Sequence, residues 1–252
     1  MEVIASLRGL VVQRVDWLTD EQDGCLVPGT PSTIYLNSSI SRSRARYTVA
    51  HEVVHTLLPG LGPAAKEKHW KVRFEAQSPV EQLCQVGAGE LLMPTSRVLA
   101  ETTGHRESLE LASDLGRLFD VSLEAAVRNL VDLSERGCAM SVLQLMHKPA
   151  DRVSSEQATL PGLDLPDPEK RLRVWYSWTS RVWDDRFFPP FKSVPEDSVA
   201  YAALQNAGSG DSVIFSATED WTEVGRVGVC RLQAVGMPLL PQTVLCLISE
   251  TA

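Results

Sequence analysis

The sequence predicts an α+β protein with a mostly helical first part and a small mixed α/β second part. Apolar residues of the first part recur at three- and four-residue spacing, which indicates amphipathic helices, whereas those of the second part fall in short β-prone runs. The segment DRVSSEQATLPGLDLPDPE between them gathers Ser, Pro, Gly and Asp, as linkers do. We therefore expect a core at residues 1–106, a helical hairpin region at 107–148, a linker at 149–169 and a second domain at 170–252.

The first part is expected to hold one short strand and four helices. TIYL at Thr33–Leu36 is β-prone and is closed by the turn residues Asn-Ser-Ser. A helix should then run from Arg44 to Leu58, where Pro and Gly stop it. The next helices are expected, in order, at Val80–Met93, Glu107–Phe119 and Leu123–Gly137. The last two are separated by only three residues, so they form a tight helix-turn-helix hairpin.

The second part is expected to consist mainly of strands. Its β-prone runs are separated by Gly, Pro and Asp, and Val194–Asn206 favours a helix. The expected strands are Leu172–Trp178, Asp211–Phe215, Val227–Leu232 and Thr243–Ile248. Seven aromatic residues crowd between Trp175 and Phe191, which indicates the core of this part, or else a ligand pocket or a partner surface.

Composition argues against a general nucleic-acid or membrane binder. The net charge is −8, which disfavours non-specific attraction to phosphates and anionic lipids. The five cysteines are far apart and form no CxxC pair, which is typical of reduced thiols. Since the sequence shows neither a secretory signal nor a run long enough to span a bilayer, we expect a cytoplasmic protein.

The chemistry is concentrated in HEVVH, residues 51–55. His51 and His55 are four residues apart, so on a helix both imidazoles project from one face and can bind one Zn²⁺. Glu52 lies beside that face, where its carboxylate can reach a water molecule without being a ligand. This spacing predicts a zinc site with Glu52 as the catalytic base.

A zinc site in an enzyme normally has three protein ligands and one open position, so a third ligand is needed. Glu81 is the first candidate, because it begins the second long helix, where a carboxylate can approach the first. Glu90 on the same helix and His69 in KEKHWK remain alternatives.

The segments RARYTVAHEVVH and EQLCQVGAGELLMP resemble the ImmA/IrrE family of metallopeptidases. Its patterns are (R/F/Y)T(L/V)AHExxH and, roughly, ExxANxFAxxLLMP. Position by position, the resemblance places His51, His55 and Glu81 on the family's metal ligands and Glu52 on its catalytic glutamate. The chain departs from the second pattern at three positions, which leave every ligand position intact: Cys84, Gln85 and Gly87.

The resemblance covers about Thr33–Pro94 and continues more weakly through the hairpin. It implies a zincin-like endopeptidase, using Zn²⁺ with Mn²⁺ as a substitute, that cuts one or a few regulatory proteins. The typical substrate is an Xre-type helix-turn-helix repressor, whose loss releases stress-response or mobile-element genes. IrrE-type members also carry a C-terminal sensor-like domain of GAF type, which residues 170–252 are expected to form.

The sequence leaves several roles unassigned. The donor that steadies the tetrahedral oxyanion could be Tyr47, His69 or His105. The second helix of the hairpin has few basic residues, so packing or substrate docking is favoured over direct DNA binding. Three arginines before the zinc helix form either a solvated strip or a contact for an acidic substrate segment: Arg42, Arg44 and Arg46. The competing function is a non-enzymatic regulator that keeps the zinc scaffold for protein binding. The sequence predicts no oligomeric state.

Overall fold

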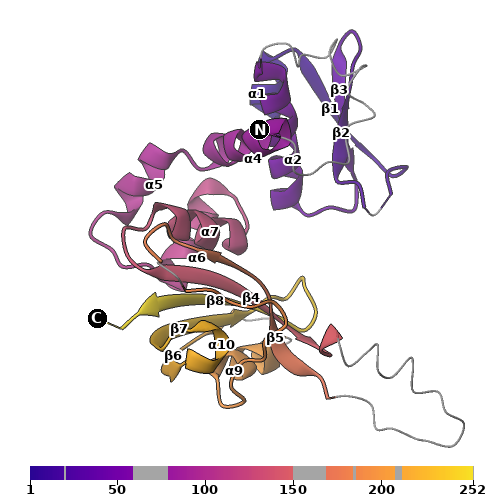
Figure 1. Cartoon of the computed structure of the whole chain (residues 1–252). Helices are drawn as coiled ribbons and strands as arrows, with labels where there is room; N and C mark the ends of the chain where they lie inside the picture. Colours follow the sequence, from indigo (N-terminus) through magenta and orange to yellow (C-terminus); the bar gives the residue numbers. More distant parts are fainter. Residues whose placement is uncertain (20, 59–78, 150–168, 184–185, 208–211, 252) are drawn as a thin grey trace, which may run out of the picture. The chain divides into compact units, whose positions relative to one another are not determined.

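The computed structural model describes residues 1–19, 21–58, 79–149, 169–183, 186–207 and 212–251. They form two compact units, which Figure 1 shows with their sheets and helices. The N-terminal unit comprises residues 1–103 and 115–122, and the C-terminal unit comprises 104–114 and 123–252. The expected α+β class is confirmed, because the chain contains helices and two separate sheets. No helix within the described ranges has both the length and the apolar character that a bilayer crossing requires.

The N-terminal unit contains a three-stranded sheet in the order β1-β3-β2. β1 (Leu10–Val15) runs parallel to β3 (Ser32–Asn37), and β2 (Gly24–Val27) runs antiparallel to β3. β3 is the strand that the TIYL run predicted. The apolar core between this sheet and the helices contains Ala5, Leu10, Leu26, Ile34, Leu36, Ala45, Val49 and Val53.

The described part of this unit also contains the helices α1 (Glu2–Leu7), α2 (Arg42–Leu57), α4 (Pro79–Leu92) and α5 (Thr95–Thr102). α2 and α4 are the two expected helices that carry the zinc motif and its partner. They pack against each other closely at Gly87, where an added Cβ would lie 2.8 Å from Val54 Cγ1. The missing side chain at this position therefore permits a close helix contact.

The helical hairpin consists of α6 (Leu109–Phe119) and α7 (Leu123–Leu133). α6 ends in a Schellman-type turn, in which Asp120 has a positive φ of 55° and the N–H of Val121 donates to the carbonyl of Gly116 at 3.0 Å. α7 is shorter than expected, because the chain leaves the helix before Gly137 and enters a strand.

The C-terminal unit is built on a five-stranded antiparallel sheet in the order β5-β4-β8-β7-β6. The four expected strands each overlap an observed strand: β5 (Arg171–Thr179), β6 (Ile214–Asp220), β7 (Val229–Gly236) and β8 (Thr243–Glu250). The agreement is poorest for β6, which shares only residues 214–215 with the expected strand. β4 (Cys138–Met146) was not predicted, yet it lies inside the sheet between β5 and β8. Residues 150–168, nearly all of the expected linker, lie outside the described residues.

The helix α9 (Val199–Asn206) covers one face of this sheet, and the short α10 (Thr222–Gly225) follows β6. The crowded aromatic residues divide between core and surface. Trp183 and Phe188 are buried and stack with ring centroids 6.2 Å apart, whereas Trp175 and Phe187 are exposed. All five cysteines are buried and unbridged.

Candidate metal centre

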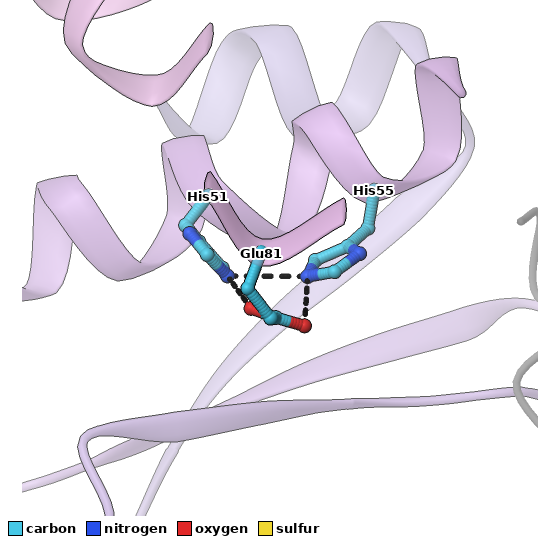
Figure 2. A group of neighbouring side chains, drawn as sticks. All are labelled: His51, His55 and Glu81. Atoms are coloured by element: carbon cyan, nitrogen blue, oxygen red, sulfur yellow. Dashed lines mark hydrogen bonds and ion pairs between the residues drawn. The ribbon is translucent and has the colours of Figure 1, made fainter. Parts of the chain in front are cut away.

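α2 places the two motif histidines on one face, as the four-residue spacing predicts. The imidazole centroids of His51 and His55 are 4.8 Å apart, and the rings are nearly perpendicular. Both Nε2 atoms point to the same place, 3.1 Å from each other (Figure 2). Two imidazoles are thus directed at one point in front of the helix.

Glu81 brings the third donor from the first turn of α4. One of its carboxylate oxygens lies 3.0 Å from His51 Nε2, and the other lies 3.4 Å from His55 Nε2. Figure 2 shows the carboxylate facing both rings. Within the described residues, these three side chains are the group of His, Cys, Asp or Glu residues that could hold a metal ion.

The spacing of these donors fits a small tetrahedral ion. Zn²⁺ binds nitrogen and carboxylate oxygen at about 2.0–2.2 Å, so neighbouring ligand atoms of a tetrahedron lie about 3.3 Å apart. The donor separations of 3.0, 3.1 and 3.4 Å are close to that value. Two imidazoles and one carboxylate are also a donor set that catalytic zinc sites use. The residues present therefore fit the ion that the motif implies.

Glu52 follows His51 on α2 and is 5% exposed. A carboxylate so far from bulk water is costly unless it has polar or charged neighbours. It is not part of the three-residue donor group. Because it directly follows His51, it remains the candidate for a group that acts on a reactant next to the donors.

The alternative third ligands are placed elsewhere or are not described. The Glu90 carboxylate accepts hydrogen bonds from the backbone N–H and the hydroxyl of Thr95, at 3.1 and 2.7 Å, and so caps α5. His69 lies outside the described residues. Of the candidate oxyanion donors, Tyr47 lies one turn before His51 with a ring centroid 6.2 Å from its imidazole, while His105 belongs to the C-terminal unit.

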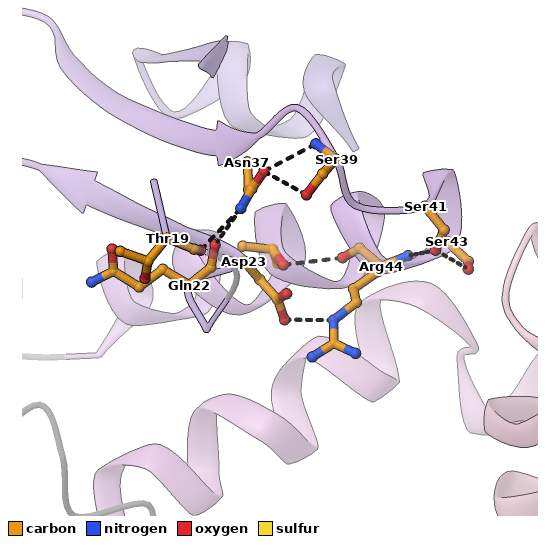
Figure 3. Close-up of polar contacts among 9 residues, drawn as sticks. Thr19, Gln22, Asp23, Asn37, Ser39, Ser41, Ser43 and Arg44 are labelled. Atoms are coloured by element: carbon orange, nitrogen blue, oxygen red, sulfur yellow. Dashed lines mark hydrogen bonds and ion pairs between the residues drawn. The ribbon is translucent and has the colours of Figure 1, made fainter. Parts of the chain in front are cut away.

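A buried asparagine fixes the chain where it enters α2, a role that the sequence did not predict. Asn37 is 4% exposed and donates from Nδ2 to the carbonyls of Thr19 and Gln22, at 3.1 and 3.2 Å. Its Oδ1 accepts from the N–H and hydroxyl of Ser39 (Figure 3). The Asn-Ser-Ser run indicated a turn, but nothing in it showed that the side chain joins two loops.

The three arginines at the start of α2 bind within the N-terminal unit. Arg44 donates to the Asp23 carboxylate at 2.6 Å (Figure 3), and Arg42 donates to Asp120 at 2.6 Å. Arg46 donates to the carbonyl of Asp120 at 3.0 Å and is more buried than Arg42. These side chains therefore tie α2 to the β1–β2 loop and to the hairpin turn.

Comparisons with known proteins point to the same kind of site. Residues 9–131 match the family model described as the IrrE N-terminal-like domain, a peptidase family (M78). This match supports membership of the ImmA/IrrE family, which the two sequence motifs indicate. The match includes the whole of α2, α4 and α6 and all of α7 except its last two residues, and hence the three clustered donors.

Two curated relatives carry the name radiation response metalloprotease IrrE. The Deinococcus deserti protein is 31% identical over 113 residues, which are 44% of this chain and 40% of that protein. The Deinococcus radiodurans protein is 25% identical over 161 residues, which are 64% of this chain and 47% of that protein. The chain thus matches less than half of the length of either relative.

The structure is also similar to that of a Mycobacterium tuberculosis transcriptional regulator. The likeness covers 99% of this chain and 69% of the other, with a TM-score of 0.50 and 14% identity. At that identity the likeness concerns the fold alone.

Proposed function

We propose that the chain is a zinc-dependent endopeptidase of narrow specificity, with Mn²⁺ able to substitute for Zn²⁺. The observation that carries the proposal is the convergence of two imidazoles and one carboxylate, 3.0–3.4 Å apart, beside the buried Glu52. Family membership supports a metalloprotease, and the donor set favours zinc over the oxygen-preferring magnesium and calcium.

In this mechanism His51, His55 and Glu81 hold the ion. A bound Zn²⁺ supplies Lewis acidity, which polarises a substrate carbonyl and lowers the pKa of a water molecule. Glu52 accepts the proton of the attacking water and passes it to the leaving amine. Tyr47 is the candidate donor to the oxyanion, because its ring lies near His51 and is 40% exposed.

We infer that the substrate is a helix-turn-helix repressor of the Xre type, cut in the cytoplasm to release stress-response or mobile-element genes. This part rests on the ImmA/IrrE membership, because no described residue identifies the substrate. The five buried, unbridged cysteines are compatible with a reducing compartment.

Direct DNA binding by the hairpin is not part of the proposal. Three charged side chains of α7 are engaged with β5 of the same unit: Glu124 accepts from the Tyr176 hydroxyl, Asp132 accepts from the Trp178 indole, and Arg128 stacks over the Trp178 ring. A reading helix needs such side chains free to reach base edges.

We assign regulation or recruitment, and not catalysis, to the C-terminal unit, and we retain a GAF-like domain as its proposed type. The antiparallel sheet with α9 on one face is compatible with such a domain. Support for the assignment comes from the donor group, all of whose members belong to the N-terminal unit. Because β4 pairs with both β5 and β8, a chain ending near Lys148 would leave this strand without its partners.

Cleavage of the repressor encoded beside the gene tests the proposal. The full chain, loaded with Zn²⁺ or Mn²⁺, should produce one discrete fragment, and Glu52→Gln should produce none. The alternative function is a non-enzymatic regulator that uses the metal scaffold for protein binding. If the wild type and Glu52→Gln both bind the repressor and neither cleaves it, the result favours that alternative.

A further inference from the structure

The C-terminal unit contains a cavity that is unrelated to the metal donors. It has a volume of about 670 Å³ and is lined by residues of β6, β7 and β8 and by the loops before α6 and after α7. Figure 1 shows these three strands side by side in the sheet. Small-molecule sites typically have volumes of about 300–1,000 Å³, so this cavity is large enough for a metabolite.

One wall of the cavity is a polar row produced by the strand register. Arg231 of β7 is paired with Thr218 of β6 on one side and with Ser249 of β8 on the other. Directly paired residues share a face of the sheet, so the side chain of Arg231 lies in one row with those of Thr218 and Ser249. This face is opposite to the apolar core, because the neighbours of Arg231 in the strand, Cys230 and Leu232, are buried in that core.

The loops add two more arginines to the same cavity, Arg106 and Arg136. Arg136 lies 3.5 Å from the Glu107 carboxylate, which also accepts from the hydroxyl of Ser134 at 2.7 Å. Among the described residues, neither Arg106 nor Arg231 forms an ion pair of this kind. Neither guanidinium is held by a carboxylate within ion-pair distance, although the charge of Arg231 also acts on the Glu110 carboxylate.

The acidic residues of the cavity do not cancel this charge. Glu107 is compensated by Arg136, and Glu250 is compensated by Arg186 at 2.7 Å. Glu135 is exposed to solvent, as Arg106 and Arg231 are, and no ion pair joins it to another described residue. Among the described lining groups, those without an ion-pair partner are thus two arginines and one glutamate, which leaves an excess of one positive charge.

We propose that this cavity binds a small molecule through an oxyanion, a phosphate or carboxylate group, held by Arg231 and Arg106. A guanidinium presents parallel N–H donors that match both anions, and the hydroxyls of Thr218 and Ser249 supply further donors. The site is separate from the metal centre and does not depend on peptidase activity. It makes the C-terminal unit a receptor for a small anionic effector.

Calorimetric titration of the full chain tests this site, with inorganic phosphate and acetate as separate probes at constant ionic strength. At least one of the two probes should bind saturably, with a stoichiometry of about one per chain. Which probe binds shows whether the site prefers a phosphate or a carboxylate group. Arg231→Gln should weaken binding at least tenfold, and Arg97→Gln, an exposed arginine of α5, should not change it. The affinity should be the same in Glu81→Ala, which excludes binding at the metal centre.

Heats equal to those of sodium chloride for both probes would overturn the proposal, and so would unchanged affinity in folded Arg231→Gln. If that variant does not fold, the double variant Thr218→Val/Ser249→Ala takes its place and should weaken binding severalfold. Unchanged affinity in the folded double variant would equally count against the site.

Discussion

The metal centre of the N-terminal unit and the arginine-lined cavity of the C-terminal unit are assembled in different ways. Two of the three metal donors lie four residues apart on one helix, so the spacing that creates the site is visible in the sequence. The polar row of the cavity comes from three strands and exists only through their register. The first site depends on one helix pair, and the second on a whole sheet.

The largest effect on activity should come from a change at Glu52, which is next to the metal donor His51 in the sequence. Glu52→Gln should lower the rate of substrate cleavage by about 10²–10⁴-fold, because an amide cannot accept the proton of the attacking water. Zinc content and the unfolding midpoint should stay close to those of the wild type, since the change keeps the shape of the side chain. Normal cleavage by this variant would rule out a hydrolytic role for Glu52.

The α2–α4 contact that brings Glu81 to the histidines should be sensitive to a single methyl group. Gly87→Ala would place a Cβ 2.8 Å from Val54 Cγ1, whereas Gly89 on the same helix has open space. Both variants gain the same helix propensity, so the free energy of unfolding of Gly87→Ala should be lower than that of Gly89→Ala by about 1–3 kcal/mol. Chemical denaturation of both proteins measures the difference, and zinc affinity should fall only in Gly87→Ala. Equal stabilities would show that the helix contact is not tight.

The arginines at the start of α2 should contribute to the stability of the fold according to how deeply each is buried. Arg46 is 28% exposed and donates to a main-chain carbonyl, whereas Arg42 is 80% exposed. Arg46→Ala should lower the free energy of unfolding by about 1–2 kcal/mol, and Arg42→Ala by less than about 0.5 kcal/mol. An equal loss of unfolding free energy in both variants would show that the contribution of these arginines to stability does not depend on their burial.

The smallest effect concerns the acid stability of the C-terminal unit. Burial raises the pKa of Glu110, but hydrogen bonds from its own N–H, Gln233 and Ser108, with the charge of Arg231, hold the pKa below its ordinary value of 4.5. A group whose pKa is lower in the folded state stabilises the fold at pH values above its unfolded-state pKa. This stabilisation is lost as the pH falls through the folded-state pKa. The stability gap between the wild type and Glu110→Gln should therefore be present near neutral pH and shrink below pH 4.5. A gap that grows on acidification would contradict this sign.

The elements that carry the metal site were predictable because their signals are local. The α2 sequence has an N-cap serine, helical spacing and a following Pro-Gly, and the observed helix begins two residues and ends one residue from the expected bounds. The third donor was harder, because helix position alone left Glu81, Glu90 and His69 open. The structure separates the first two: Glu81 faces the histidines, and Glu90 caps α5.

β4 could not be predicted because its composition favours another structure. CAMSVLQLM is rich in Ala, Met, Leu and Gln, which are good helix formers. The strand forms because β5 and β8 pair with its two edges, a long-range gain that outweighs local preference. The role of Asn37 could not be predicted for a similar reason, since its partners at Thr19 and Gln22 become neighbours only in the folded unit.

Zinc content tests the central assignment most directly. Elemental analysis of the purified full chain and of two α4 variants should give about one Zn²⁺ per chain for the wild type and for Glu90→Ala, and almost none for Glu81→Ala. Glu90→Ala removes only the α5 cap, so it controls for damage to the helix. Tight zinc retained by Glu81→Ala, or lost equally from both variants with the fold intact, would contradict a site made of His51, His55 and Glu81.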